Sequence, residues 1–227
     1  METIITNFAP TPSVVANTAR KDEWAGMKYL TQKELSKLFR TIEKSKVSNR
    51  FYLRDLCMVN IAYLCWLRTS EVGMLRLEQY NSSRGEIFIK RLKGSSSNTL
   101  RLDETRKNLL EKYIREYRKE EVGILRIKDE SDFLFKSKNG KQLWGASFAF
   151  IFREFAKEAG LPESKQHPHT LKHSIGIHLT ESGVDIKDLQ YYLGHKNVLN
   201  TMTYFKYTSK QFEDLYRKIW TENVLVS

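Results

Sequence analysis

The chain has 227 residues, and its 38 Lys and Arg outnumber its 27 Asp and Glu, so the formal net charge is +11. Apolar residues make up 41% of the sequence and aromatic residues 12%, which is enough to bury a core and excludes a disordered or low-complexity chain. A basic excess of this size predicts an acidic partner, either nucleic acid or an anionic membrane surface. The basic residues are spread along the chain, which favours a folded basic surface over a membrane-lying helix.

The sequence carries no sign of membrane insertion or secretion. No run of about 18 apolar residues occurs, and the first residues lack the basic segment of a secretory signal. We therefore expect a cytoplasmic protein without membrane contact, associated with the nucleoid if its partner is DNA. Cys57 and Cys65 both lie in an apolar run, which predicts two buried thiols in a reducing compartment, not a disulfide.

The first part of the chain predicts an arm followed by two helices. Residues 1–26 hold a Pro-Thr-Pro turn and no sustained apolar period, so we interpret them as a poorly ordered N-terminal arm or linker. Thr31 and Glu34 have the spacing of a capping box, and an apolar stripe at helical spacing follows them. Residues 53–67 are apolar almost all round, which is typical of a helix in the middle of a domain.

The middle of the chain predicts a small sheet. Glu86–Leu92 and Asn98–Leu102 favour strands, and the Gly- and Ser-rich segment between them indicates a hairpin. A helix is expected over 104–118, and Asp132–Phe135 is expected to add a third strand before the turn at Asn139.

The last part of the chain is helical by its pattern. An aromatic stripe from Phe148 to Ala159 predicts a helix that ends at Gly160. Two further helices are expected after Pro168, closed by Gly183 and Gly194, and a last segment from about Leu199. The fold class is therefore α+β, mainly helical, with a small antiparallel β-sheet.

All five histidines fall in one short segment. They are His167, His169, His173, His178 and His195. His169 and His173 are four residues apart and would share a helix face, which suggests a zinc site. Lys172 places a cation between them, and the glutamate of an H-E-x-x-H hydrolase is missing. We therefore expect no metal, and keep a zinc hydrolase as an alternative that elemental analysis would test.

The wider set of polar residues suits phosphodiester chemistry without a metal. This set consists of Arg68, Lys93, His169, Lys172, His195 and Tyr204. Cationic donors stabilise the charge that builds on phosphate oxygens, an acid protonates the leaving sugar oxygen, and a phenol can attack phosphorus. Residue types and spacing alone make this chemistry suggestive.

The same residues lie in segments that resemble a known family. The segments 67–72 (LRTSEV), 169–174 (HTLKHS) and 193–196 (LGHK), with Tyr204 nine residues after His195, are similar to the boxes of the tyrosine recombinases, or phage integrase family. The resemblance covers roughly residues 28–210 and implies the catalytic-domain fold of that family. His167-Pro168-His169 and the compact hairpin at 91–94 are similar to the short fimbrial phase-variation invertases.

The resemblance also implies a role for each matching residue. Tyr204 would be the nucleophile that attacks the scissile phosphate and stays joined to the 3′ phosphate. Arg68 would hold the non-bridging oxygens with its planar fork of donors. Lys93 would be the general acid for the 5′ hydroxyl, presented from a mobile loop, and His169 and His195 would bond the phosphate and share proton handling.

Supporting roles and one departure complete the expected site. Glu71 would orient the site as a neighbouring carboxylate, and His173 is expected to be a structural partner. Lys172 stands where the family's second arginine normally lies, and lysine lacks the bidentate fork of arginine. Three interpretations of Lys172 stay open: a natural variant with tuned activity, a partly degenerate recombinase, or an engineered trap for a stalled complex.

The function implied is a site-specific DNA recombinase that cleaves and rejoins strands through a 3′-phosphotyrosine intermediate, with integration, excision or inversion as the outcome. The chemistry requires no cofactor, because bond energy is kept in the phosphotyrosine. The alternative is a catalytically weakened DNA-binding accessory or regulatory protein of the same fold. Relaxation of supercoiled DNA, as by a type IB topoisomerase, would share the chemistry.

The expected partners and domains follow from this resemblance. We expect double-stranded DNA as the partner, a homo-oligomer that is a dimer on one site and a tetramer in synapsis, and host DNA-bending proteins as possible helpers. Residues 27–207 would form the catalytic domain, and 208–227 a C-terminal helical tail. A separate core-binding domain is not expected from 26 preceding residues, so the protein would hold DNA from one side or with partners. Tyr191 and Tyr192 are expected in the core, and Tyr207 is the nearest rival of Tyr204.

Overall fold

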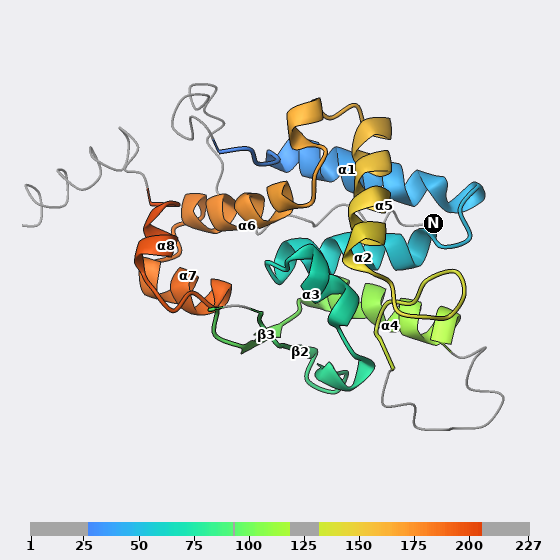
Figure 1. Cartoon of the computed structure of the whole chain (residues 1–227), viewed down its shortest axis with the longest axis horizontal. Coiled ribbons are helices and arrows are strands. Elements are labelled where there is room, and N and C mark those ends of the chain that lie inside the picture. Colours follow the sequence, from blue (N-terminus) through green and yellow to red (C-terminus); the bar gives the residue numbers. More distant parts are fainter. Residues whose placement is uncertain (1–26, 93, 119–131, 206–227) are drawn as a thin grey trace, which may run out of the picture.

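The computed structural model describes residues 27–92, 94–118 and 132–205, as a body of helices with one small sheet (Figure 1). The expected arm at 1–26, Lys93, Tyr207 and the expected tail at 208–227 lie outside the described residues. The α-helices are α1 (Gln32–Lys44), α2 (Tyr52–Leu64), α3 (Thr69–Met74), α4 (Glu104–Arg118), α5 (Gly145–Glu158), α6 (His169–Glu181), α7 (Ile186–Leu193) and α8 (Leu199–Met202). The strands are β1 (Tyr80–Asn81), β2 (Glu86–Ile89) and β3 (Asn98–Arg101), and short 3₁₀ turns lie at Ser45–Val47, Leu77–Gln79 and Glu163–Lys165.

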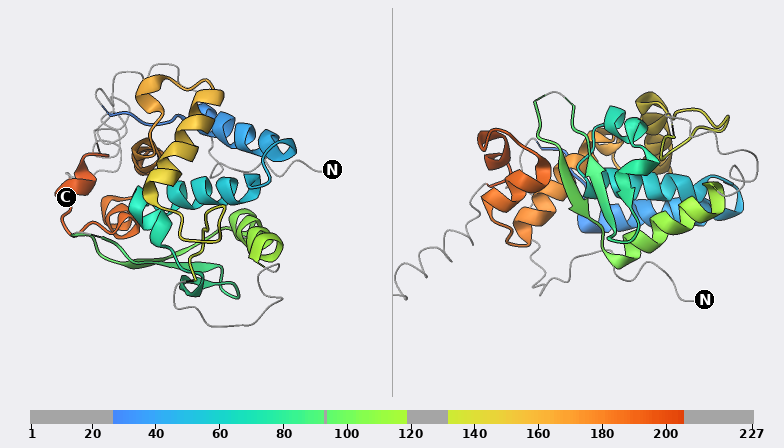
Figure 2. Two further views of the ribbon diagram at one scale, coloured as in Figure 1. Left: turned by 45° about the vertical axis from the view of Figure 1, so that its right-hand side comes forward. Right: turned by 90° about the horizontal axis from the view of Figure 1, so that it is seen from below.

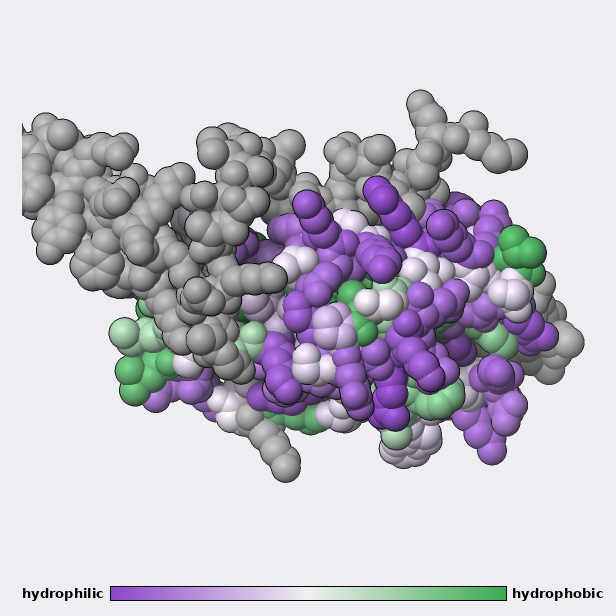
Figure 3. Space-filling view, turned by 90° about the horizontal axis from the view of Figure 1, so that it is seen from above, coloured by the Kyte–Doolittle hydropathy of each residue, from purple (hydrophilic) through white to green (hydrophobic). Residues whose placement is uncertain are grey.

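The first helix begins where its capping residues predict. The Thr31 side chain accepts a hydrogen bond from the Glu34 backbone N–H, and the Glu34 carboxylate accepts one from the Thr31 N–H, which is a complete capping box. The expected apolar stripe is buried, at Leu35, Leu38, Phe39 and Ile42. The opposite side of α1 faces solvent, and the face over α1 and α5 is predominantly hydrophilic (Figure 3).

Helix α2 is the centre of the core. Every residue from Leu53 to Tyr63 is buried, and α2 contacts α1, α3, α4 and α6. Its two charged residues, Arg54 and Asp55, pair with each other at 2.7 Å, which satisfies their charges inside the protein. The helix was expected to extend over 53–67, but it ends at Leu64, and Trp66 turns the backbone into the left-handed region with φ +53°.

The sheet contains the expected hairpin but a different third strand. Strands β2 and β3 pair antiparallel, with Ile87 opposite Leu100, and β1 pairs along the other edge of β2. The prediction of a strand at Asp132–Phe135 is wrong, because this segment makes only an isolated bridge, between Phe133 and Arg76. Leu134 and Phe135 are both buried in the core, so consecutive side chains do not alternate as those of a strand would.

The C-terminal part of the described chain places α7 beside the hairpin. Helices α6 and α7 are followed by Gly183 and Gly194, both at positive φ, as the sequence predicts. The β2–β3 hairpin extends toward α7 and α8 (Figure 2), and α7 contacts β3. Of the two tyrosines expected in the core, Tyr192 is half-buried and donates to the Leu64 carbonyl, whereas Tyr191 is 67% exposed, so its prediction is wrong.

Two further expectations concern thiols and membranes. Cys57 and Cys65 are free and buried, as predicted, and burial raises the pKa of the Cys65 thiol to about 12. Among the described helices, none is long and apolar enough to cross a membrane.

Candidate active site

The site begins where α2 gives way to α3, at Arg68. Arg68 precedes the first residue of α3, and its backbone N–H donates to one carboxylate oxygen of Glu71 at 2.8 Å. Its guanidinium donates to the other oxygen at 2.9 Å. The Arg68 side chain is one-third exposed, whereas that of Glu71 is buried. The buried Glu71 therefore holds Arg68 from the protein interior and leaves the exposed part of its guanidinium free for a ligand.

Glu71 also ties the hairpin to this corner. Its carboxylate accepts the backbone N–H of Leu92 at 2.9 Å, and Arg68 donates to the Leu92 carbonyl at 3.0 Å. Leu92 is the residue before Lys93, whose own position lies outside the described residues. The residue before Lys93 is thus anchored by hydrogen bonds to Arg68 and Glu71.

Arg91 is a buried part of this corner that the sequence did not mark as a site residue. Its guanidinium donates to the carbonyls of Cys65 and Trp66, at 2.8 and 3.2 Å, and lies 3.9 Å from Glu71. Burial lowers the pKa of Arg91, and the nearby Glu71 opposes that change. Arg91 therefore closes the turn between α2 and α3 on the inside of the protein.

The hairpin tip meets the loop that carries His195. The Ser96 backbone N–H donates to the Gly194 carbonyl at 2.7 Å, and Ser95 forms an isolated bridge with His195. Gly194 has φ +67°, and a Cβ there would collide with the backbone of Ser96. Glycine thus allows both the turn after α7 and the close approach of the hairpin. Arg68 also reaches this tip, through Ser95 Oγ at 3.4 Å.

Lys172 lies on α6 with its side chain turned into the protein. The residue is 4% exposed, and its ammonium lies 3.5 Å from the centre of the Trp66 ring. Burial lowers the pKa of Lys172 to about 7; Arg68 also lowers it, and Glu71 acts in the opposite direction. The charge of Lys172 therefore changes near neutral pH.

His195 lies against the same tryptophan. Its ring packs edge-to-face with Trp66 at 4.6 Å between centroids, and its Nδ1 is hydrogen-bonded to the Thr201 hydroxyl at 2.9 Å. Burial, followed by the charges of Lys172 and Arg68, lowers the pKa of His195 to about 4. His195 is therefore neutral at pH 7.

Tyr204 packs on α6 beside a different histidine. The residue is 3% exposed, and its hydroxyl lies 3.4 Å from His173 Nδ1. A Cβ at Gly176 would lie 2.6 Å from the Tyr204 ring, so only glycine leaves room for this packing. The His173 ring in turn contacts His169, which is exposed at the start of α6. Burial lowers the pKa of His173 to about 4 and raises that of the Tyr204 phenol.

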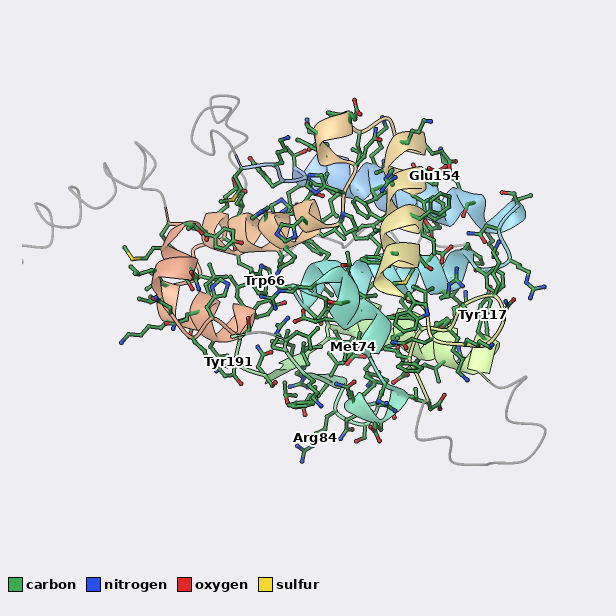
Figure 4. The ribbon with its side chains drawn as sticks, viewed as in Figure 1. Trp66, Met74, Arg84, Tyr117, Glu154 and Tyr191 are labelled. Atoms are coloured by element: carbon green, nitrogen blue, oxygen red, sulfur yellow. The ribbon has the colours of Figure 1, made fainter. Side chains whose placement is uncertain are left out.

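The structure thus brings most of the predicted residues into two connected groups. In the first group Arg68 pairs with Glu71, the Lys172 ammonium lies over the Trp66 ring, and the His195 ring packs edge-to-face with it. The other is Tyr204 with His173 and His169. Trp66 lies between α6 and the start of α3 (Figure 4). The sequence did not mark Trp66 or Arg91 as site residues. The one pattern that included either of them was the hairpin segment at 91–94, which begins with Arg91.

The electrostatics of this corner favour an anion. Arg68, Arg91 and Lys172 lie around one buried carboxylate, Glu71, and their positive charge lowers the pKa of His195. Within the described residues, no group of three or more His, Cys, Asp or Glu is placed to hold a metal ion. The partly exposed guanidinium of Arg68 is the group that a phosphate from solvent could contact first.

Comparisons with known proteins agree with this fold and these segments. The sequence profile of the phage integrase family matches residues 28–211, so the chain belongs to the phage integrase family. Tyrosine recombinase XerD of Listeria monocytogenes is 33% identical over 78% of this chain and 58% of its own length. The type 1 fimbriae regulatory protein FimE of Escherichia coli is 31% identical over 88% of this chain and 94% of its own length.

The fold is that of a tyrosine recombinase catalytic domain. A solved structure of the XerH site-specific recombinase, bound to its difH substrate, superposes with a TM-score of 0.68 over 83% of this chain and 53% of that protein, at 23% identity. The chain spans less than two-thirds of the length of the XerD relatives, and nearly the whole of FimE. The predicted fold class is confirmed, a mainly helical domain with a small antiparallel sheet.

Proposed function

We propose that this protein is a site-specific DNA recombinase that cleaves and rejoins DNA strands through a 3′-phosphotyrosine intermediate. The observation that carries the proposal is the meeting of Arg68, Lys172 and His195 around Trp66, with Tyr204 packed against the neighbouring helix. Family membership and the names of the similar proteins, XerD and FimE, support it.

The cations of the site would bind the scissile phosphate. Arg68 donates two N–H groups to the non-bridging oxygens, because Glu71 holds the rest of its fork in place. Lys172 adds a positive charge from α6. His195 completes the cradle: when the Thr201 hydroxyl donates to Nδ1, the ring proton is on Nε2 and can be donated to phosphate. These donors stabilise the negative charge that develops on the non-bridging phosphate oxygens in the transition state.

Bond formation and bond cleavage would then proceed in line. The Tyr204 oxygen attacks phosphorus and forms the phosphotyrosine bond, while the bond to the 5′ oxygen breaks. The phenolic proton passes to His169, one of the two histidines to which the family resemblance assigns proton handling, because His173 contacts the phenol in its buried position. Lys93 donates a proton to the departing 5′ oxygen from the hairpin that Leu92 anchors. The reverse steps, with a new 5′ hydroxyl, rejoin the strands.

Tyr204 must move before it can react. Its side chain is 3% exposed, and its hydroxyl faces His173 inside the protein. Burial raises the pKa of the phenol, which keeps it protonated and unreactive in the free protein. We infer that DNA binding or assembly with a second subunit releases the segment that carries Tyr204.

Double-stranded DNA is the proposed partner, because the chain has a net charge of +11 and the similar structures include recombinases bound to DNA. A dimer on one site and a tetramer at synapsis are proposed as well, with residues 1–26 as an arm, 27–207 as the catalytic domain and 208–227 as a tail. Host DNA-bending proteins would assist where the protein holds DNA from one side.

Recovery of covalently attached DNA tests the proposal without knowledge of the target sequence. Purified protein is mixed with sheared genomic DNA from its source organism, denatured in SDS, and recovered by an affinity tag; the attached fragments are then sequenced. We expect one or a few enriched sites, because a phosphotyrosine bond survives denaturation. Tyr204→Phe should recover no fragments after SDS and the same fragments under native conditions.

Tyr191→Phe is the matched control, because Tyr191 is exposed and lies apart from the cluster. It should recover the same fragments as the unchanged protein. DNA that stays attached to Tyr204→Phe after denaturation would overturn the assignment of the nucleophile. Native binding at defined sites without any covalent product, in the unchanged protein and in Lys172→Arg, would favour the alternative of a DNA-binding regulatory protein.

A further inference from the structure

Trp66 has an unusual backbone conformation for its residue type. Among the described residues, it is the one non-glycine residue with positive φ, at +53°, and it is 6% exposed. A side chain other than glycine is strained in this region of the backbone map. A residue keeps such a strained conformation only where the surrounding contacts hold it, and strained residues are often found at functional sites. The contacts of the indole therefore need an explanation.

The indole is the point where the cations of the site converge. The Lys172 ammonium lies 3.5 Å from its ring centre, and the ring of His195 packs edge-to-face at 4.6 Å. The guanidinium carbons of Arg68 and Arg91 lie 5.8 and 5.7 Å from the ring. Lys172 is buried, and within the described residues its ammonium lies against the indole face. A desolvated cation on an indole face is a strong form of the cation–π interaction.

The nitrogen of the same indole is a buried donor. The Trp66 N–H is buried and has no hydrogen-bond partner among the described residues. Trp66 also lowers the pKa of the Tyr204 phenol, against the larger rise that burial causes. A buried donor without a partner costs free energy, so this N–H is available for the Tyr204 oxygen.

We propose that Trp66 is a positioning residue of the active site, whose indole holds the Lys172 ammonium in place, so that Trp66 and Lys172 act as one unit in phosphate binding. This inference rests on the proposed function for its role in catalysis. The contact itself is independent of DNA.

The groups around Lys172 show why a neutral aromatic partner suits it. Arg68 and Glu71 face it from the start of α3, Arg91 from the segment after β2 and His195 from the loop after α7. His169 and His173 lie on its own helix. Glu71 is the one carboxylate among these groups. A second carboxylate beside Lys172 would compete with phosphate for the ammonium. The indole face stabilises the ammonium and leaves the net charge of the site positive.

A double-mutant cycle tests whether Trp66 acts through Lys172. Covalent adduct formation is measured in single turnover on a nicked duplex that carries a site recovered as described above. We expect Trp66→Leu to lower the rate about thirtyfold, which corresponds to about 2 kcal/mol at about 1.4 kcal/mol per tenfold. In a Lys172→Met background the same change should have less than a threefold effect, because the interaction is already absent.

Conservative and distant variants separate positioning from general damage. Trp66→Phe keeps an aromatic face and should recover at least a third of the rate, whereas Trp66→Leu keeps only apolar bulk. Trp144→Leu is the matched control, because Trp144 is 67% exposed, and its rate should be unchanged. Equal losses from Trp66→Leu in the two Lys172 backgrounds would overturn the proposal, because they would show a role independent of Lys172.

A spectroscopic titration tests the contact without DNA and without a change at Trp66. Trp24, Trp144 and Trp220 are replaced by Phe in the full chain, so that Trp66 is the remaining tryptophan, and its emission is followed from pH 5.5 to pH 10. We expect a transition with a midpoint near 7, because the pKa of Lys172 is lowered to about 7. The transition should be absent in Lys172→Met.

The two experiments separate failure of the inference from failure of the proposed function. A Lys172-dependent transition without covalent DNA would contradict recombinase activity and support the Trp66–Lys172 contact. Covalent DNA in the unchanged protein, with an emission profile that Lys172→Met does not alter, would support the activity and overturn the contact.

Discussion

At the scale of single residues, a lysine at position 172 makes the candidate site respond to pH in a way that an arginine would not. Arginine keeps its charge throughout the physiological range. Lys172 is buried beside Arg68, and its pKa is lowered to about 7. Because a lysine loses its charge when the pH rises above its pKa, the site has its full positive charge only below pH 7. Lys172 thus adds pH sensitivity to a site that arginine would leave insensitive.

The pH profile of cleavage therefore should differ between the unchanged protein and Lys172→Arg. With DNA below saturation, the rate of adduct formation reports the protonation of the free protein. We expect the Lys172-dependent part of the rate in the unchanged protein to fall about tenfold for each unit above pH 7, because the charged fraction falls in that proportion. The rate of Lys172→Arg should lack this decline. A decline of the same size in both proteins would assign the titration to another group.

The sequence indicated the charged residues that the structure brings together at the candidate site, but not the aromatic and buried residues among them. Arg68 and Glu71 were found because a short box places them three residues apart, and the structure pairs them at 2.9 Å. Trp66 was missed because an aromatic residue at the end of an apolar run is typical of the core. The property that sets Trp66 apart, a left-handed backbone, has no signal in a single sequence. Arg91 was missed because its burial depends on carbonyls that only the folded turn presents.

At the scale of elements, local signals were reliable and long-range pairing was not. The cap at Thr31 and the ends of α6 and α7 depend on neighbouring residues, and the structure confirms them. Asp132–Phe135 has strand-forming residues, but its backbone–backbone hydrogen bonds join it to Leu75 and Leu77, which lie outside the strands of the sheet. The third strand is instead β1, which pairs with the free edge of β2. It has two residues, and a strand of that length leaves no recognisable pattern in the sequence.

The packing of Tyr204 on α6 gives a prediction for Gly176. A helix interior normally favours alanine over glycine by about 1 kcal/mol. At Gly176, however, an added Cβ would lie 2.6–2.8 Å from three atoms of the Tyr204 ring. We expect Gly176→Ala to lower the free energy of unfolding by about 1–3 kcal/mol through overpacking, measured by urea denaturation.

Removal of the ring tests the cause of this effect. In Tyr204→Ala the space beside Gly176 is open, so Gly176→Ala should then stabilise the protein by about 0.5–1 kcal/mol, as alanine does in an ordinary helix. Destabilisation of similar size in both backgrounds would mean that the cost comes from another neighbour. In that case Gly176 would not be the residue that makes room for Tyr204.

At the scale of the whole molecule, the candidate active site is a junction of segments that are distant in the sequence. The end of α2, the start of α3, the hairpin, α6 and the loop after α7 meet at Trp66, Glu71 and Gly194. The hairpin that carries Lys93 is held at both ends, by Leu92 and by Ser96. A ligand that shifts one of these segments therefore acts on all of them, and DNA is the proposed ligand large enough to contact several at once.

The net charge of the molecule gives the last prediction. A protein with a charge of +11 that holds DNA mainly through phosphates releases a counterion for each phosphate that it neutralises. With about 6–10 such contacts, the affinity should fall by about 10³–10⁵ between about 50 and about 200 mM salt. The measurement is fluorescence anisotropy of a labelled duplex with the Tyr204→Phe protein, in which no covalent product is expected.

The slope of this salt dependence distinguishes two ways of holding DNA. A steep slope on a duplex without a target site means that the basic surface faces DNA, because phosphate contacts are independent of sequence. A slope that corresponds to about two contacts or fewer would mean that most of the positive charge lies away from DNA. Such a protein could not rely on its own phosphate contacts, and its binding to a target site would depend on other subunits or on DNA-bending partners.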